Sequence, residues 1–167
     1  MSLTHFTADH HFSHANIIPY SKRPFASAGE MDGEMMLRWN EAVSPGDAVY
    51  HLGDFALASA NRIAELLTGL NGYKILICGN HDRSAKRMVE LGFDEAYGEA
   101  EHEGWRLVHR PPADPDRKTL CGHVHGLWMT RGSPECPMIN VGVDVRDYTP
   151  RTLEEITASA WPPEERA

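Results

Sequence analysis

The sequence predicts a layered α/β or α+β domain. In the first half of the chain, segments typical of strands alternate with segments of helical periodicity, and in the second half most apolar segments are typical of strands. The length of 167 residues suits one hydrophobic core, and the hydrophobic fraction of 41% is ordinary for a soluble globular protein. We therefore expect one domain over residues 1–160, followed by an exposed tail rich in proline and glutamate over residues 161–167.

Three strands, each followed by a helix, are expected in the first half of the chain. The expected strands are Leu3–Ala8, Ala48–Leu52 and Tyr73–Cys78, and the expected helices are Gly29–Val43, a segment marked by Ile63, Leu66, Leu67 and Leu70, and Ser84–Leu91. In the first helix, Met31, Met35 and Trp39 follow helical spacing until a Ser-Pro-Gly sequence ends the element. Ser59 or Asn61 is expected to cap the second helix. The third strand is a continuous apolar run, which is typical of a strand buried on both faces.

Strands dominate the second half of the expected fold. The candidates are Glu95–Glu101, Trp105–His109, Thr119–Gly122 and Met138–Val145, with a closing helix at Thr152–Ala160. Two proline-rich loops, Arg110–Lys118 and Gly132–Pro137, interrupt these strands. Loops next to strand ends are where functional residues tend to lie.

Charge and cysteine content exclude several classes of function. The net charge of −8 argues against binding to extended nucleic acid, which needs a basic surface. Cys78, Cys121 and Cys136 are odd in number and form no C-x-x-C pair, so reduced thiols are expected rather than a disulfide framework. We expect a cytoplasmic protein with no membrane partner, because the chain shows no secretory signal and no apolar run near the ~20 residues of a membrane span.

Five short clusters of polar residues carry the chemical information in this sequence. They read Asp9-His10-His11, Gly53-Asp54, Gly79-Asn80-His81-Asp82, His109, and Gly122-His123-Val124-His125. Four of them stand where an expected strand gives way to a loop, and several strand ends on one sheet edge can converge on a point. Within the first and last clusters the outer residues lie two apart, which would place both side chains on one side of an extended segment. The glycines would allow sharp turns and close approach.

These clusters, in this order, resemble the calcineurin-like metallophosphoesterase superfamily. The pattern is D-x-H, then G-D, then G-N-H-D, then a lone His, then G-H-x-H. The segments HFSHANIIPYSKRPF, VYHLGDF, LNGYKILICGNHD and NVGVDV are similar to small, single-domain bacterial and phage members. The resemblance covers nearly the whole chain. It implies two packed mixed β-sheets flanked by helices, with a pair of metal ions at one edge of this sandwich.

The resemblance also implies a role for each residue of the clusters. Asp9, His11 and His125 would hold one metal ion, Asn80, His109 and His123 would hold a second, and Asp54 would bridge both. A hydroxide shared by the metals would attack phosphorus, while His81 would donate a proton to the leaving oxygen or stabilise its charge. Imidazole, carboxylate and amide ligands suit Mn, Fe or Zn, among which we expect Mn first. Two such metals ~3.5–4 Å apart would activate water and offset the negative charge on the attacking oxygen and on the leaving oxygen.

Residues around these clusters leave several alternatives open. His14 and Arg23 are candidate substrate contacts, since Arg suits bidentate contact with phosphate; the alternatives are a first-turn helix residue for His14 and a surface ion pair for Arg23. Leu57 stands where some relatives carry an acidic residue that orients the catalytic His, so the sequence does not show what orients His81. His51 is either a hydrogen-bond partner behind the ligands or an ordinary strand residue. Asp144 is expected to serve a turn, and His10 to be packed or solvated.

The expected function is metal-dependent hydrolysis of a phosphodiester. Small or cyclic nucleotides are candidate substrates, because the chain is short and leaves no room for an added nucleic-acid-reading domain. A phosphomonoesterase of the same fold is the alternative within the enzyme class. A non-catalytic scaffold that binds a nucleotide or a partner is the alternative in another class, although none of the expected ligands is missing. An amidohydrolase or metallo-β-lactamase would place H-x-H early in the chain, and here it comes late. The natural substrate, the metals and the oligomeric state stay open.

Overall fold

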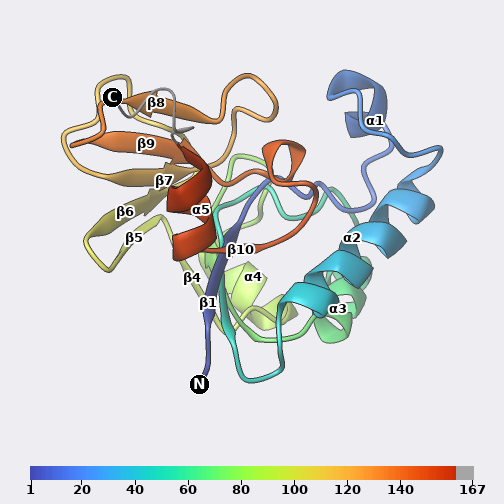
Figure 1. Ribbon diagram of the computed structural model, residues 1–167. Helices are drawn as coiled ribbons and strands as arrows, with labels where there is room; N and C mark the ends of the chain where they lie inside the picture. Colours follow the sequence, from blue (N-terminus) through green and yellow to red (C-terminus); the bar gives the residue numbers. More distant parts are fainter. Residues whose placement is uncertain (161–167) are drawn as a thin grey trace.

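A computed structural model describes residues 1–160 and shows two packed β-sheets with helices around them (Figure 1). Each sheet has five strands within these residues. The expected layered α/β fold with two mixed sheets is therefore confirmed. The exposed tail expected at 161–167 lies outside the described residues.

The first sheet carries the amino-terminal strands of the chain. It consists of β1 (Thr4–Thr7), β2 (Ala48–His51), β3 (Tyr73–Ile77), β4 (Glu95–Tyr97) and β10 (Arg151–Thr152), in the order β10-β1-β2-β3-β4. Strands β1 to β4 are parallel, and β10 pairs antiparallel with β1. In the register, His5 lies opposite Val49, and Val49 lies opposite Lys74. The parallel arrangement brings the carboxyl ends of β1, β2 and β3 to one edge.

The second sheet is built from the later strands. It consists of β5 (Glu99–His102), β6 (Trp105–Val108), β7 (Thr119–Cys121), β8 (Thr130–Gly132) and β9 (Pro137–Asn140), in the order β5-β6-β7-β9-β8. Its three central strands are parallel, and both edge strands run antiparallel to their neighbours. The loops that follow β6 and β7 therefore leave this sheet at one edge.

Helices cover the first sheet and close the sandwich. They are α1 (Ile17–Tyr20), α2 (Ala28–Ala42), α3 (Ala60–Gly69), α4 (Ala85–Leu91), the short 3-10 helix η1 (Val143–Val145) and α5 (Leu153–Ala160). The side chains of Ser27, Ser59 and Ser84 each accept a hydrogen bond from the backbone N–H three residues on, which satisfies a free donor at the start of α2, α3 and α4. Figure 1 shows α2 and α3 on the side of the first sheet away from the second sheet.

The apolar side chains form two main cores on opposite faces of the first sheet. One core joins helices α2, α3 and α4 to this sheet and includes Trp39, Leu66 and Leu76, all buried. The other lies between the sheets and includes Phe6, Leu107 and Ile156, also buried. The first sheet is thus covered on both faces, as parallel sheets usually are.

Four details differ from the expectations drawn from the sequence. The single strand expected at Glu95–Glu101 is wrong, because the chain leaves the first sheet after Tyr97 and joins the second at Glu99. The strand expected at Met138–Val145 ends at Asn140 and is followed by η1. The short elements α1, β8 and β10 were not expected. Strand β3 is exposed or half-buried over its first two residues and is buried only over the last three.

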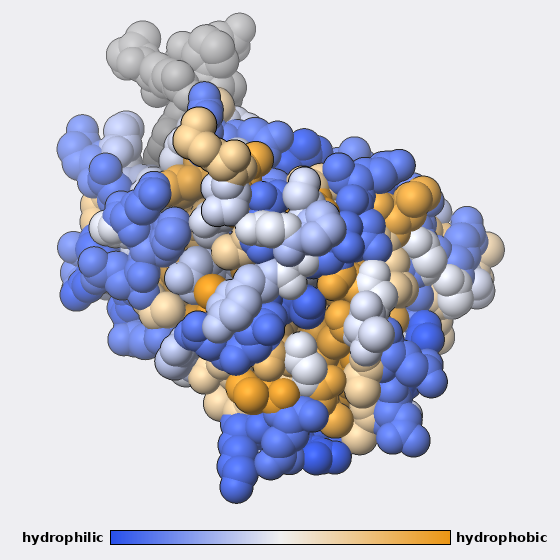
Figure 2. Space-filling model, turned by 90° about the horizontal axis from the view of Figure 1, so that it is seen from below, coloured by the Kyte–Doolittle hydropathy of each residue, from blue (hydrophilic) through white to orange (hydrophobic). Residues whose placement is uncertain are grey.

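Figure 2 shows the molecule from below, which is the end at which β1 begins in Figure 1. This face is mostly hydrophilic, with separate hydrophobic patches. The clusters expected to carry the chemistry lie beyond the opposite ends of the parallel strands. Across residues 1–160, every helix is too short or too polar to cross a lipid bilayer.

Candidate metal centre

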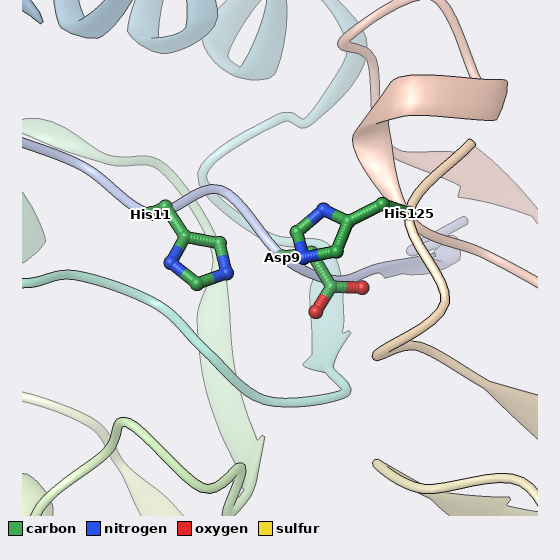
Figure 3. Close-up of side chains that lie close together, drawn as sticks. All are labelled: Asp9, His11 and His125. Atoms are coloured by element: carbon green, nitrogen blue, oxygen red, sulfur yellow. The ribbon is translucent and has the colours of Figure 1, made fainter. Parts of the chain in front are cut away.

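Polar side chains from five loops converge where the two sheets meet at the carboxyl ends of their parallel strands. Two groups have ligand atoms that all lie within 4.8 Å of one another: Asp9, His11 and His125 form the first group, and Asp54, His109 and His123 form the second. Each group takes residues from loops of both sheets. Figure 3 shows the three side chains of the first group close together. The chain therefore contains two groups of Asp and His residues that could hold a metal ion.

One carboxylate oxygen connects the two groups. Oδ2 of Asp54 lies 3.5 Å from Nε2 of His11 and 3.4 Å from Nε2 of His109. Asn80 joins the second group, since its Oδ1 lies 3.1 Å from Nε2 of His109. All seven residues expected as ligands are thus brought to one place, with Asp54 between the two groups.

Five of the candidate ligand residues have a left-handed backbone conformation, which residues other than glycine rarely adopt. The φ angles of the five non-glycine residues concerned are positive: Asp9 59°, His11 50°, Asp54 57°, His123 71° and His125 47°. Left-handed conformations cost energy and cluster at functional sites, where the surrounding structure holds them. The extended segments expected for the D-x-H and H-x-H pairs are therefore wrong. The paired side chains converge because left-handed turns redirect them, not because they alternate along a strand.

Two glycines allow the ligand loops to pack against each other. A Cβ atom at Gly79 would collide with Oδ1 of Asp54 and lie 2.5 Å from its backbone nitrogen. A Cβ atom at Gly122 would lie 2.7 Å from Oδ2 of Asp9. These contacts confirm the close approach expected from the sequence, and any larger residue would have to displace a carboxylate of the site.

Hydrogen bonds behind the ligands fix their orientation. Nδ1 of His109 donates to the carbonyl of Leu52 over 2.7 Å, and Nδ1 of His125 lies 2.9 Å from Oδ2 of Asp144. These bonds occupy Nδ1 of each ring as a donor, so Nε2 is the ring nitrogen that a metal ion would bind in place of a proton. Asp82 holds the loops of the second group from behind, because its carboxylate accepts hydrogen bonds from the backbone N–H groups of residues 54, 55 and 79.

Burial shifts the pKa values of these groups strongly. Burial raises the pKa of Asp9 to about 7, against the charges of His109 and His125, which lower it. Burial also lowers the pKa of His11 to about 3. In Asp54, hydrogen bonds from His109 and from the backbone of His81 outweigh burial, and the pKa lies well below its usual range. The protein thus buries a carboxyl, Asp9, whose charged form lacks sufficient compensation from its neighbours.

The unsatisfied atoms of the first group fit a cation. Oδ1 of Asp9 and both ring nitrogens of His11 are buried and form no hydrogen bond with any residue of the described chain. Buried polar atoms without a partner are costly and rare in proteins. A divalent ion bound to Asp9 and His11 would supply a partner for both side chains. The nitrogen and oxygen donors match those that Mn, Fe and Zn accept.

His81 and His14 line an open cavity of about 880 Å³ above the two groups. The His81 ring is exposed and lies edge-on to His11, with 5.3 Å between ring centres. Within residues 1–160 this ring forms no hydrogen bond, so its orientation rests on packing. His81 and Leu57 both line a second, smaller cavity. The structure thus places His81 and His14 where a substrate could reach them.

The substrate contact expected for Arg23 is wrong. Its side chain is fully buried, and its guanidinium is bound to Asp144 and to two backbone carbonyls beneath the first group. The alternative of a surface ion pair is also wrong, since this pair is buried. Two further residues support the site: Asp144, expected to serve a turn, contacts His125, and Nδ2 of Asn140, for which no role was expected, donates to the carbonyls of His125 and residue 128. Both residues lie in the segment NVGVDV (residues 140–145), which stands out in the sequence only for its resemblance to small members of the superfamily. The fold brings this segment next to His125, from which it is separated in the sequence.

The remaining histidines are structural. His10 and His51 are fully buried and share a hydrogen bond of 2.9 Å between Nδ1 and Nε2. His10 is therefore packed, as expected, and His51 contacts His10 rather than a ligand. His5 lies in β1 beside Asp47, with 3.2 Å between Nε2 and Oδ2, and His102 lies in β5. All three cysteines are free.

Comparisons with known proteins find matches to nearly the whole chain. The uncharacterized protein MJ1445 of Methanocaldococcus jannaschii is 35% identical, and the alignment covers 93% of this chain and 90% of that protein. The crystal structure of the protein of unknown function AQ665 from Aquifex aeolicus superposes with a TM-score of 0.72 at 28% identity, covering 95% of this chain and 99% of that one. No protein-family model matches the chain.

Proposed function

The chain belongs to the family of MJ1445, and we propose that it is a dinuclear metal-dependent phosphoesterase of the calcineurin-like type that hydrolyses a phosphodiester. The observation that carries this proposal is the position of Asp54. One oxygen of this carboxylate lies between His11 of the first group and His109 of the second, within 3.5 Å of both. A carboxylate shared by two groups of imidazole and carboxylate donors suits a pair of adjacent metal ions.

The chain's residues would divide the work at such a centre. Two bound divalent ions, Mn ahead of Fe or Zn, would supply an activated water and positive charge toward the reacting phosphate. Asp9, His11 and His125 would hold one ion, and Asn80, His109 and His123 the other. Asp82 would keep Asp54 in place through the backbone of its loop. The left-handed ligand loops fix these positions before substrate arrives, which favours a preorganised site.

His81 would act on the leaving group. Its ring lines the cavity beside His11 and is exposed, so it can reach a substrate without serving as a ligand. A positioned proton donor typically contributes roughly 10²–10⁴-fold in rate. His14 lines the same cavity and is a candidate contact for a phosphate oxygen.

The shape of the cavity favours a small diester with an apolar or aromatic group. The polar groups described above line it together with the apolar side chains of Ile17, Tyr20, Val124 and Leu127. Tyr20 and Leu127 are 80% and 82% exposed, so two large apolar side chains beside the polar groups are free to contact a substrate. Ligand sites commonly combine apolar walls with a few convergent polar groups. A small nucleotide phosphodiester has both kinds of surface.

Metal analysis and paired aryl substrates test the proposal. The purified protein is loaded with Mn²⁺ and assayed on bis(4-nitrophenyl) phosphate and on 4-nitrophenyl phosphate. We expect bound metal, faster turnover of the diester, and loss of activity on chelation. The Asp54→Asn variant should be inactive, whereas Asp116→Asn, on a side chain 69% exposed, should match the wild type. Faster turnover of the monoester would make the protein a phosphomonoesterase, and no turnover of either ester by metal-loaded protein would refute the proposed function.

A further inference from the structure

A buried ion pair lies directly beneath the first group of candidate ligands. Nε of Arg23 lies 2.9 Å from Oδ1 of Asp144, and Nη2 lies 3.0 Å from Oδ2, so the contact is bidentate. The two side chains are 0% and 4% exposed. Buried pairs of this kind are costly to desolvate and are weak evidence for a purely stabilising role. Their other contacts indicate what the pair does.

Arg23 also holds the backbone of the loop that carries Asp9 and His11. Its Nη2 donates to the carbonyl of Asp9 and its Nη1 to the carbonyl of His10, each over 2.7 Å. Both candidate ligands of this loop have left-handed backbones, which need external support. The planar guanidinium, with several donors in fixed directions, can bind two carbonyls and one carboxylate at once.

Asp144 extends this link to the other loop of the same group. Its Oδ2 lies 2.9 Å from Nδ1 of His125 as well as 3.0 Å from Arg23. A carboxylate behind a metal-binding imidazole fixes the tautomer and the orientation of the ring. It also raises the basicity of the nitrogen that binds the metal. In the second group, by contrast, His109 has a neutral backbone carbonyl, that of Leu52, in the same position.

We infer that Arg23 and Asp144 form a positioning pair that shapes the metal site of Asp9, His11 and His125. The pair joins the loop after β1 to the loop after β7 across the two sheets. It orients the imidazole of His125 through Asp144 and the turn at Asp9 through Arg23. This inference rests on the metal centre of the proposed function but requires no ester hydrolysis. Neither residue is expected to touch substrate, because both are buried below the ligands.

The test measures metal affinity site by site. Mn²⁺ is titrated calorimetrically into two backgrounds: His109→Ala, which leaves all candidate ligands of the first site, and His11→Ala, which leaves all candidate ligands of the second. Adding Asp144→Asn should weaken binding by about 10–100-fold in the first background and by less than about threefold in the second. Asp147→Asn is the matched control, because this carboxyl is 76% exposed and pairs with Arg38 at the surface.

A second variant keeps the inference testable if Asp144→Asn alters folding. Arg23→Lys retains the buried positive charge but cannot reach both carbonyls and the carboxylate together. It should weaken Mn²⁺ binding at the first site alone, with little change in the second. Unchanged affinity, or equal weakening in both backgrounds, would overturn the inference. Failure of both variants to fold would do so too, since the pair would then belong to the fold and not to the metal site. The wild type could bind metal and hydrolyse no ester, while the variants weaken Mn²⁺ binding at the first site alone. In that case the proposed function fails and the inference stands.

Discussion

The backbone N–H of His81 donates a hydrogen bond of 2.9 Å to Oδ1 of Asp54. The residue proposed to protonate the leaving group is therefore attached to the carboxylate proposed to lie between two metals. The bond uses the main chain, so replacing the His81 side chain with that of alanine retains the donor. Metal binding and proton donation can thus be separated by mutation.

Replacing His81 with alanine is expected to reduce kcat by roughly 10²–10⁴-fold while both metal ions stay bound. The measurement is the turnover of bis(4-nitrophenyl) phosphate together with the metal content of the same sample. His102→Ala, in the distant strand β5, serves as the control and should behave as the wild type. Unchanged activity in metal-loaded His81→Ala would show that the assigned role is wrong.

Gly79→Ala is expected to disrupt the site from behind. The added methyl group would collide with the Asp54 carboxylate and displace it, at a cost of about 1–3 kcal/mol in unfolding free energy and with a marked loss of metal affinity. Gly126→Ala is the matched control, since a Cβ atom there meets no other atom within 4 Å. Denaturant unfolding and Mn²⁺ titration of both variants check this. Wild-type metal affinity in Gly79→Ala would contradict the close packing described here.

Metal binding should release a proton from Asp9. Because burial raises the pKa of Asp9 to about 7 in the metal-free protein, this carboxyl is mostly protonated at pH 6 and must ionise to bind a cation. Metal affinity should therefore rise as the pH increases from 5.5 towards 7 and change less above that range. Calorimetric titration in two buffers of different ionisation enthalpy counts the protons. At pH 6, Asp9→Asn should release fewer protons for each ion that still binds.

The buried pair of His10 and His51 should make the fold sensitive to acid. Burial, and then the partner ring, lower the pKa of His10 well below its usual value, and burial lowers that of His51 to about 3. Both rings stay neutral while the unfolded chain protonates them, so their stabilising contribution is present above pH about 6.5 and is lost as the pH falls towards 3. The loss approaches about 1.4 kcal/mol per pH unit for each ring.

Urea unfolding of the metal-free protein between pH 7.5 and 4.5 measures this loss. A double variant, His10→Phe with His51→Phe, retains aromatic packing and should show a shallower decrease in unfolding free energy over the same range. Equal pH dependence in the two proteins would show that other groups cause the acid sensitivity.

Tyr20→Ala should impair the use of aromatic esters without affecting the metal centre. The Tyr20 ring is 80% exposed beside the cavity and lies 6.3 Å from the His125 ring, where it can contact an aryl group of the substrate. An aromatic contact contributes about 0.5–1.5 kcal/mol, so KM for the aryl diester should increase up to about tenfold. Tyr97→Ala, on the edge strand β4, is the control. A KM unchanged by Tyr20→Ala would exclude this contact.

The sequence reveals the parts of the site that depend on local pattern. Strand ends could be located because segments typical of strands stop before Asp9, Asp54 and Asn80. The packing glycines Gly79 and Gly122 stand directly before Asn80 and His123. The partners behind the ligands could not be located. Arg23 and Asp144 lie 121 positions apart, and only the assembled sandwich brings them together. Arg23 looks the same in the sequence whether it binds phosphate or supports a loop.

The backbone of the ligand loops was unpredictable for a related reason. Left-handed φ angles at Asp9 and His11 are unfavourable for an isolated chain, so local propensity predicts an extended segment. The conformation is held by contacts from elsewhere, such as the bond from the Asp9 nitrogen to the carbonyl of Gly53. The Glu95–Glu101 segment is divided between the two sheets for a similar reason. Which strand each half pairs with depends on the tertiary fold and not on the residue types of the segment.

Each candidate metal group takes its donors from both sheets: Asp9 and His11 face His125 across the sandwich, and Asp54 faces His109 and His123. A bound ion would therefore act as a cross-link between the two halves of the fold. Metal occupancy would oppose any opening that separates the sheets, with a free energy that grows as RT ln(1 + [metal]/Kd). Metal supply in the surroundings would then set not only the activity of this protein but also its lifetime against unfolding and proteolysis.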